Sequence, residues 1–360
     1  NAANVKPETV ITRPDHYVKT VLWTGNDVAR SIVTGNAPDL VWIKDRSITK
    51  DPVLCDSVRG AGETLRPDDP AANVTAIQRV SAFNSNGFSV GTDSGVNNNN
   101  DNFVGWTWKA GGNKNTFNVD DVGYASAAAA GITGGTITPT GASVGTKQGF
   151  SIIKYTGTGS NASVSHGLQN IPQFIIVKDL DSTSGWWAVY HHSMGNTHAL
   201  YLNDAQSKVD SSFWNDTTPT SSVFTIGANA NTNSSNDFIS YLWHDVPGLQ
   251  KFGSYEGNGS ADGTFVELGF TPALIIHKDI DQGHNWHIFD NKRDPDNPVH
   301  HRLFPSNNSA DSTGDNSLDF LSNGFKCRSS NTTSESSTYI YAAWAEAPTF
   351  NLYGGQSNAR

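Results

Sequence analysis

The sequence has few of the residues on which disulfide scaffolds and nucleic-acid-binding surfaces depend. Among 360 residues there are one methionine, only 16% charged residues and two cysteines, Cys55 and Cys327. The two cysteines occupy different points of the repeat pattern described below, so we expect two buried free thiols rather than a disulfide. The formal charge is −10 and Lys and Arg are scattered, which argues against binding to nucleic acid through phosphates.

Long hydrophobic runs and familiar catalytic motifs are absent as well. No uninterrupted apolar stretch approaches the twenty residues of a membrane helix, so we expect no membrane insertion. There is no G-x-S-x-G, no glycine loop for phosphates and no Cys/His spacing of a zinc type. We therefore expect a protein that is not an enzyme, with no catalytic residue and no cofactor.

Asn, Ser, Thr and Gly are abundant, aromatics reach 10%, and one pattern of residues occurs three times. Each occurrence opens with an aromatic before a glycine turn: Trp23, Tyr155 and Tyr255. A proline and an apolar run ending in Lys-Asp follow, at residues 38–45, 172–179 and 272–279, with six residues from Pro to Lys each time. A later aromatic lies at Phe88, Phe224 and Phe325. Each copy closes on an aromatic and, five residues later, a tryptophan: Phe103 with Trp108, Phe238 with Trp243, and Tyr339 with Trp344.

This spacing predicts an all-β protein of three tandem β-sandwich repeats, jelly-roll-like, with few helices. The expected parts are an N-terminal segment and repeat 1 (1–110), a linker or projecting arm rich in Ala, Gly and Thr (111–148), repeat 2 (149–247), and repeat 3 with a tail (248–360). The loop 245–251 is too short to let repeats 2 and 3 separate, so we expect them to pack as one block.

Strands are expected where β-branched and aromatic residues cluster between Gly, Asn and Pro. In the second copy they are Phe150–Tyr155, Phe174–Lys178, Trp187–His191, Leu200–Leu202, Val223–Ile226 and Phe238–Trp243. The run 174–177 is apolar without alternation, which predicts a central strand covered on both faces. Asn86-Gly87 and Asn323-Gly324 fit the positive φ angles of tight hairpin turns.

Few side chains stand out as candidate binding residues. We expect the three closing tryptophans to be core anchors, because a buried indole removes about 200 Å² from water. Ligand stacking is assigned instead to tryptophans outside the repeat pattern: Trp186, Trp214 and Trp286. The recurring Lys-Asp pairs at strand ends are expected to be solvated caps.

Metal binding is a weaker expectation. Asp290, Asp294 and Asp296 are calcium candidates in a loop that otherwise predicts a salt-bridged turn, because it lacks calcium-loop glycine spacing and contains two cations. The sequence has eleven histidines, including the pairs His191-His192 and His300-His301. Adjacent residues on a strand point to opposite faces, which argues against His191 and His192 sharing one ion.

Several segments resemble a repeat module of virion structural and tail-fibre proteins of tailed bacteriophages, notably cyanophages. They are Leu54–Gly60, Phe252–Tyr255 with Gly257–Gly259, Asp290–Asp294 and Ser322–Phe325. The likeness spans nearly the whole chain from about Asp15 and departs at the Ala/Gly segment and the N-terminal start. It implies that 351–360 is a natural C-terminus. The resemblance implies a location and a role for the chain but no catalytic mechanism.

The resemblance implies a non-enzymatic protein of the virion surface, either a tail fibre or a capsid decoration, assembled through its β modules. Its expected partners are other virion proteins and further copies of itself, with a trimer favoured, and a host-surface glycan if it mediates attachment. A lectin-like carbohydrate-binding protein is the alternative. A polysaccharide-cleaving tailspike stays open, since the separations of the carboxylates are not fixed by the sequence.

Overall fold

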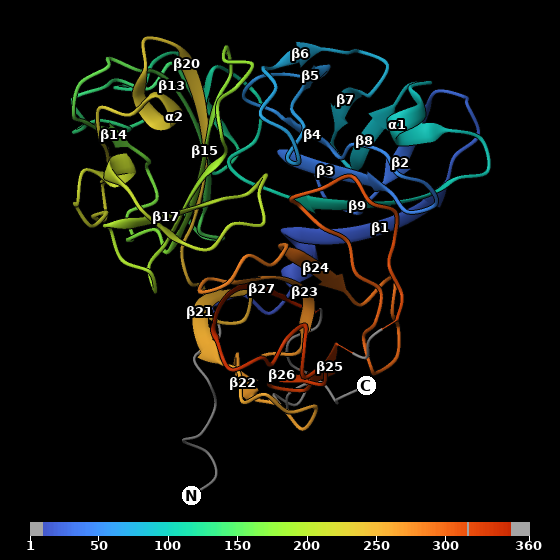
Figure 1. Ribbon diagram of the computed structural model, residues 1–360. Helices are drawn as coiled ribbons and strands as arrows, with labels where there is room; N and C mark the ends of the chain where they lie inside the picture. Colours follow the sequence, from blue (N-terminus) through green and yellow to red (C-terminus); the bar gives the residue numbers. More distant parts are fainter. Residues whose placement is uncertain (1–9, 315–316, 347–360) are drawn as a thin grey trace, which may run out of the picture.

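The computed structural model describes residues 10–314 and 317–346, and over these residues nearly all regular structure is β. We refer to residues 18–108, 150–243 and 250–345 as modules 1, 2 and 3, and to residues 109–149 as the connection. Figure 1 shows the three modules as three lobes gathered around one centre. The expected C-terminus, 351–360, lies outside the described residues.

Module 1 follows a short 3-10 turn, η2 (Pro14–His16), and its elements are β1 (Val18–Thr24), β2 (Arg30–Val33), β3 (Leu40–Asp45), β4 (Val53–Asp56), β5 (Glu63–Thr64), β6 (Val74–Thr75), β7 (Val80–Asn84), β8 (Gly87–Val90), α1 (Ser94–Asn97) and β9 (Asn102–Trp108). The connection contains β10 (Phe117–Val119), β11 (Val122–Tyr124) and β12 (Gly141–Gly145).

Module 2 contains β13 (Phe150–Thr156), β14 (Ala162–Ser165), β15 (Phe174–Asp179), β16 (Ala188–His191), β17 (His198–Tyr201), β18 (Val209–Asp210), η3 (Ser212–Trp214), β19 (Val223–Ile226), α2 (Ala230–Asn233) and β20 (Asp237–Trp243). Module 3 contains β21 (Gln250–Glu256), β22 (Phe265–Glu267), β23 (Pro272–Asp279), β24 (His287–Asp290), β25 (Leu318–Leu321), β26 (Gly324–Cys327) and β27 (Thr338–Ala345). Among the described residues, no helix has the length and apolar character needed to cross a membrane.

The same strand order is found in all three modules. The large sheets run β1-β9-β3-β4, β13-β20-β15-β16 and β21-β27-β23-β24, with all neighbours antiparallel. Smaller sheets, β2-β8-β7, β14-β19 and β22-β26-β25, provide the second layer of each module. The all-β, sandwich-like fold expected from the sequence is therefore the fold observed.

The central strands β3, β15 and β23 of the large sheets are buried on both faces. Along β15, Ile175 and Val177 face the interior of module 2, whereas Phe174 and Ile176 belong to a core shared by all three modules. All six residues of β15 are buried, which explains the apolar run without alternation. Burial on two faces also accounts for the matching runs in β3 and β23.

The three closing tryptophans meet at the centre of the shared core. Ring centroids are 6.3 Å apart for Trp108 and Trp243, 5.4 Å for Trp108 and Trp344, and 6.2 Å for Trp243 and Trp344, all edge to face. Each indole is at most 3% exposed. The space left beside them is about 10 Å³, too little for a ligand. The closing tryptophans are thus core anchors, as expected, and they hold the modules to one another.

The other aromatics of the pattern build the interior of each module. The opening aromatic of each module stacks on its cross-strand partner, the aromatic five residues before the closing tryptophan. The ring centroids are 5.6, 5.3 and 4.9 Å apart in modules 1, 2 and 3. The later aromatic, Phe88, Phe224 or Phe325, meets the opening ring edge to face. Stacking inside the sandwich explains why these positions are aromatic in every copy.

The glycines of the opening turns permit a close approach of two backbones. A Cβ on Gly25, Gly157 or Gly257 would lie about 2 Å from a carbonyl oxygen in the loop before the closing strand. Only glycine fits there. The hairpins at 84–87 and 321–324 form as expected, and Gly87 has the expected positive φ, at 147°. Both glycines also permit a close approach of two backbones. A Cβ on Gly87 or Gly324 would collide with the neighbouring strand, 2.0 Å from the carbonyl oxygen of Ile32 or Val266.

The connection is not a projecting arm. Its strands β10 to β12 extend the module 2 sheet, which β17 and β18 extend at the opposite edge, giving nine strands in all. Ala127, Ile132 and Ile137 are buried in the core of module 2. The expectation of an arm rested on the Ala and Gly content, but small residues here pack against the sheet. The alanine run forms turns rather than a helix.

The modules contact one another in a closed cycle. One backbone N–H from each of Asn73, Lys208 and Asp311 donates to the carbonyl after the Lys-Asp pair of another module, at Leu180, Ile280 and Arg46 respectively, over 2.8 to 3.0 Å. Module 1 thus bonds to module 2, module 2 to module 3, and module 3 to module 1. The expected packing of modules 2 and 3 as one block extends to module 1.

Candidate functional site

Two of the three tryptophans assigned to ligand stacking are buried. Trp214 and Trp286 are each 1% exposed, and their indole N–H groups donate to the carbonyls of His198 and Tyr201. Neither can offer a ring face to a sugar, so the assignment is wrong for both. Trp286 lies where module 3 meets module 2, which is a role in assembly. The three tryptophans were singled out because they lie outside the repeat pattern, which does not distinguish buried from exposed indoles.

Trp186 is the exposed member of the three. It is 38% exposed, and its ring lies 4.8 Å from that of Tyr201. Its backbone N–H donates to Asn231 Oδ1. An aromatic pair beside an amide side chain is chemically suited to contact a sugar ring.

The repeated Lys-Asp pairs are caps, but they are not solvated. Lys44, Lys178 and Lys278 are at most 2% exposed, and each ammonium donates to the backbone carbonyl of the aspartate that follows it. Each aspartate accepts two backbone N–H groups of the next turn. Burial lowers the pKa of all three lysines to about 8. The pair stabilises the end of the central strand where modules meet.

The three calcium candidates do not converge on one point. Asp290 is fully buried, and its Oδ2 accepts from Arg293 Nε at 2.7 Å and from Trp106 Nε1 of module 1 at 3.0 Å. Burial alone would raise the pKa of Asp290, but the charge and hydrogen bonds of Arg293 hold it below the usual value. Asp296 is exposed. The loop is therefore the salt-bridged turn that the sequence analysis set against calcium.

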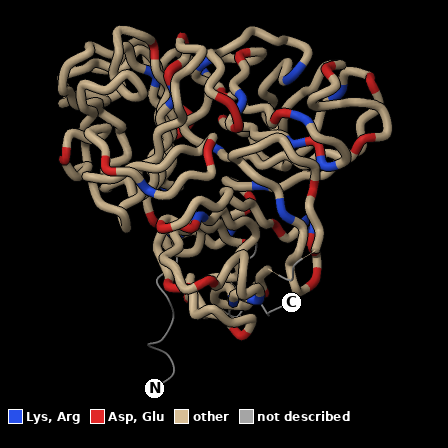
Figure 2. Tube along the Cα trace, viewed as in Figure 1, with Lys and Arg blue, Asp and Glu red and all other residues tan. Residues whose placement is uncertain are grey.

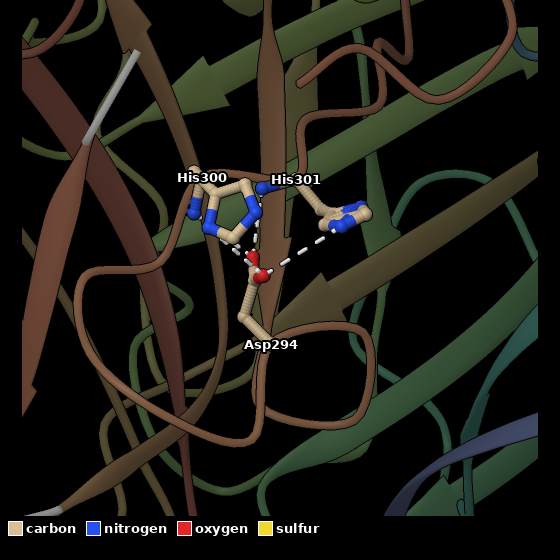
Figure 3. A group of neighbouring side chains, drawn as sticks. All are labelled: Asp294, His300 and His301. Atoms are coloured by element: carbon tan, nitrogen blue, oxygen red, sulfur yellow. Dashed lines mark hydrogen bonds and ion pairs between the residues drawn. The ribbon is translucent and has the colours of Figure 1, made fainter. Parts of the chain in front are cut away.

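A different set of ligands is assembled a few residues further on. Asp294, His300 and His301 each place one ligand atom within 4.8 Å of the others, and Figure 3 shows both imidazoles beside the Asp294 carboxylate. Asp294 Oδ1 lies 3.3 Å from His300 Nδ1 and 3.9 Å from His301 Nε2. Its Oδ2 accepts the backbone N–H groups of His300 and His301 at 2.9 and 2.7 Å.

The local backbone explains how two adjacent histidines serve one site. His300 and His301 lie in an irregular segment after the isolated bridge of Val299, not inside a strand. The alternation of strand side chains does not apply here, so both rings turn to one side. The sequence analysis noted this pair but had no signal for the backbone conformation.

Further charged groups lie behind His301. Asp311 Oδ2 is 3.2 Å from His301 Nδ1 and accepts from Arg46 Nε of module 1 at 2.9 Å, while Oδ1 accepts from Arg293 at 3.0 Å. Burial lowers the pKa of His301, against the opposing effect of the two aspartates, which favours the neutral ring that metals bind. Sequence reasoning did not single out Asp311 or Arg46.

A second group of possible ligands is Asp279, His284 and Glu335, also within 4.8 Å of one another. His284 Nδ1 lies 3.3 Å from Asp279 Oδ2 and 3.8 Å from Glu335 Oε2. Asp279 Oδ1 caps a turn and accepts from Ser337 at 2.6 Å, which leaves Oδ2 as the ligand atom, but only one imidazole is present. This group is therefore less suited to a borderline metal than the first.

The two cysteines are free and buried, as expected. Burial raises the pKa of each thiol to about 11, so neither is an activated nucleophile.

Comparison with known proteins yields one match. A family model described as a domain of unknown function, DUF7483, covers residues 13–348. No curated protein and no solved structure matches the chain.

Proposed function

The chain belongs to the DUF7483 family, and we propose that it is a non-enzymatic structural protein of a virus particle, on the surface as a tail fibre or capsid decoration. In this role the chain forms a rigid unit whose outer faces contact other virion proteins. The proposal takes its location from the phage-like motifs of the sequence and its mode of action from the arrangement of the modules.

The observation that supports this role most is the closed cycle of three sandwiches around the tryptophan centre. One chain thereby repeats the same order of strands three times, which suits a platform with threefold or quasi-threefold positions. Weak contacts made by each module would add through avidity.

The use of the recurring polar residues also fits a structural role. The Lys-Asp pairs are buried caps, and Asp56 and Asp290 join buried arginines to neighbouring modules. Figure 2 shows Lys and Arg interspersed with Asp and Glu along the described trace. Charges of both signs interspersed along the chain do not favour phosphate binding.

Particle location is tested with antibodies to the purified chain, by immunogold labelling of purified phage particles from a host infected with the virus that encodes it. We expect label at one location, on the tail or over the capsid, and none with serum absorbed on the antigen. Presence in infected-cell lysate with absence from gradient-purified particles, by labelling and by mass spectrometry, would reject the proposal.

The expected trimer remains a prediction with a direct measurement. Light scattering over a dilution series separates a 38.7 kDa monomer from an assembly of three times that mass. Because the apolar faces of the large sheets are already covered within one chain, a trimer would have to form through the outer surfaces.

Carbohydrate binding is retained as a second function on the evidence of Trp186 and Tyr201. The test is a glycan array probed with the intact chain and with Trp186→Ala, using Ile171→Ala, another exposed apolar residue, as the matched control. Binding lost only in the Trp186 variant supports the lectin-like role. No binding, or binding unaffected by either variant, removes Trp186 from consideration.

A further inference from the structure

We propose that Asp294, His300 and His301 bind one divalent transition-metal ion of the zinc class, which fastens the β24–β25 loop of module 3 to module 1. This inference rests on the geometry of the three side chains and does not depend on a virion role.

The spacing of the ligand atoms fits a single ion. Bonds of about 2.0–2.1 Å to a tetrahedral zinc place neighbouring ligand atoms about 3.3–3.4 Å apart. Asp294 Oδ1 is 3.3 Å from His300 Nδ1 and 3.9 Å from His301 Nε2, and all three ligand atoms lie within 4.8 Å of one another, so binding of one ion requires His301 to move closer to the other two. Three protein ligands leave the fourth position to water or to a group from a partner.

The identity of the donors selects the class of metal. Two imidazole nitrogens and one carboxylate oxygen suit Zn²⁺, Co²⁺ or Ni²⁺, whereas Ca²⁺ and Mg²⁺ prefer oxygen alone. His300 Nδ1 lies 3.1 Å from the carbonyl oxygen of Pro298, which accepts its proton in the metal-free chain. Metal binding to Nδ1 requires the other tautomer of the neutral ring, in which the proton moves from Nδ1 to Nε2.

The surroundings hold the ligands in place before any ion arrives. The two backbone N–H groups on Asp294 Oδ2 fix the carboxylate plane, so Oδ1 is directed at the imidazoles. His301 Nδ1 faces Asp311, the carboxylate–histidine arrangement that orients metal-bound imidazoles in proteins. Asp311 is in turn fixed between Arg46 and Arg293.

The same contacts give the site its role. Asp311 donates its backbone N–H to the Arg46 carbonyl, which is the link from module 3 to module 1 in the cycle of modules. An ion on His301 therefore acts on that link through a single side chain. The site is a positioning element for the module interface.

The experiment is titration of the chelator-treated full chain with Co²⁺ followed by visible absorption, and with Zn²⁺ by calorimetry. We expect one equivalent to bind with the d–d bands of a four- or five-coordinate ion, and zinc to displace cobalt. His300→Gln, His301→Gln and Asp294→Asn should each weaken binding at least tenfold. Asp311→Asn should weaken it about 10- to 100-fold, since loss of an outer partner has that effect in other metal sites.

The matched controls separate this site from other histidines and from loss of folding. His284→Gln removes the single imidazole of the Asp279 group, and His16→Gln removes an exposed histidine; both should bind like the parent. Asp294→Asn keeps an oxygen to accept the two backbone N–H groups, and circular dichroism confirms that each variant is folded. Absence of a bound equivalent, retention of binding in the folded Asp294 and histidine variants, or its loss in His284→Gln would each overturn the proposal.

Discussion

Modules 1 and 3 end their outer strand, β4 or β24, on an aspartate paired with an arginine three residues later, whereas module 2 ends β16 on His191, followed by Met194. Asp56 and Asp290 each accept two backbone N–H groups of the following turn and a bond from the arginine. His191 Nδ1 accepts one such N–H, from Ser193. Burial lowers the pKa of His191 to about 3, so the ring is neutral.

The partner on the neighbouring module changes with the end residue. Tyr241 and Trp106 donate to Asp56 and Asp290, and both lie two residues before a closing tryptophan. At that position module 3 has Ala342, which offers no side-chain donor, and His191 Nε2 instead donates to the carbonyl oxygen of Tyr341 at 3.2 Å. The three modules have the same arrangement of strands, but the side chain that ends the outer strand and its hydrogen-bond partner on the neighbouring module differ together, so that each donor has an acceptor.

The largest effect is expected from replacing one member of the Asp-Arg pair of module 3 by the residue that module 2 has at that position. Arg293→Met leaves Asp290 buried without its cation, and we expect the free energy of unfolding to fall by about 3–5 kcal/mol. Adding Asp290→His reproduces the module 2 pair and should recover part of the loss, because a neutral ring avoids the buried charge. Urea denaturation of the two variants measures this. A single variant within 1 kcal/mol of the parent would contradict the matched-pair account.

A second contrast concerns the residue before the Lys-Asp pair, which is Ile43, Val177 or His277. His277 is 1% exposed, and neither ring nitrogen has a hydrogen-bond partner among the described residues. Burial, with a smaller effect of Lys278 and Arg302, lowers its pKa to about 3. The unfolded chain binds a proton near pH 6.5, so His277 reduces stability as the pH falls from about 6.5 toward 3.

His277→Val should therefore be close to the parent in stability at pH 7 and more stable at pH 4, on the order of 3 kcal/mol. Denaturation curves at pH 7, 5.5 and 4 provide the measurement, with Ile43→Val as a control whose effect should not change with pH. A difference between His277→Val and the parent that is the same at all three pH values would refute the explanation.

A third contrast lies at the start of the large sheets. Opposite the closing tryptophan, modules 1 and 2 have Val18 and Phe150, but module 3 has Gln250. Gln250 accepts from Trp344 Nε1 and donates to the carbonyl oxygens of Gln148, Gly149 and His244. Gln148 and Gly149 belong to the connection. We expect Gln250→Leu to cost about 2 kcal/mol, because buried polar groups lose their partner. Thermal unfolding of this variant beside Val18→Leu tests it, and equal melting temperatures would contradict it.

The smallest effect is expected at the exposed part of the interface between modules 2 and 3. The Lys208 and Asp281 side chains form an ion pair, and each is about one-third exposed. Lys208→Ala should cost only about 0.2–1 kcal/mol, less in high salt, because the backbone bond from Lys208 to Ile280 remains. A loss above 2 kcal/mol in 0.5 M salt would mean that the side chains, rather than the backbone cycle, hold this contact.

Six of the eight strands of module 2 were predicted to within two residues, because β-branched and aromatic clusters between turn residues mark them. The strands β14 and β18 were not predicted. The expectation of an arm at 111–148 failed because small residues pack against a sheet as readily as they form a linker. The candidate site was harder to predict from the sequence. His300 and His301 were visible as a pair, but both contact Asp294 only because the backbone leaves the strand conformation just before them.

The sequence by itself determined an all-β chain whose aromatics, glycines and Lys-Asp pairs recur at matched spacing, because local propensity and sandwich packing act over short distances. Only the tertiary structure decided that the closing tryptophans meet, that the Lys-Asp pairs are buried, and that Asp311 joins a histidine of module 3 to Arg46 of module 1. Such contacts join residues as many as 265 positions apart, and the composition of neither segment records its partner.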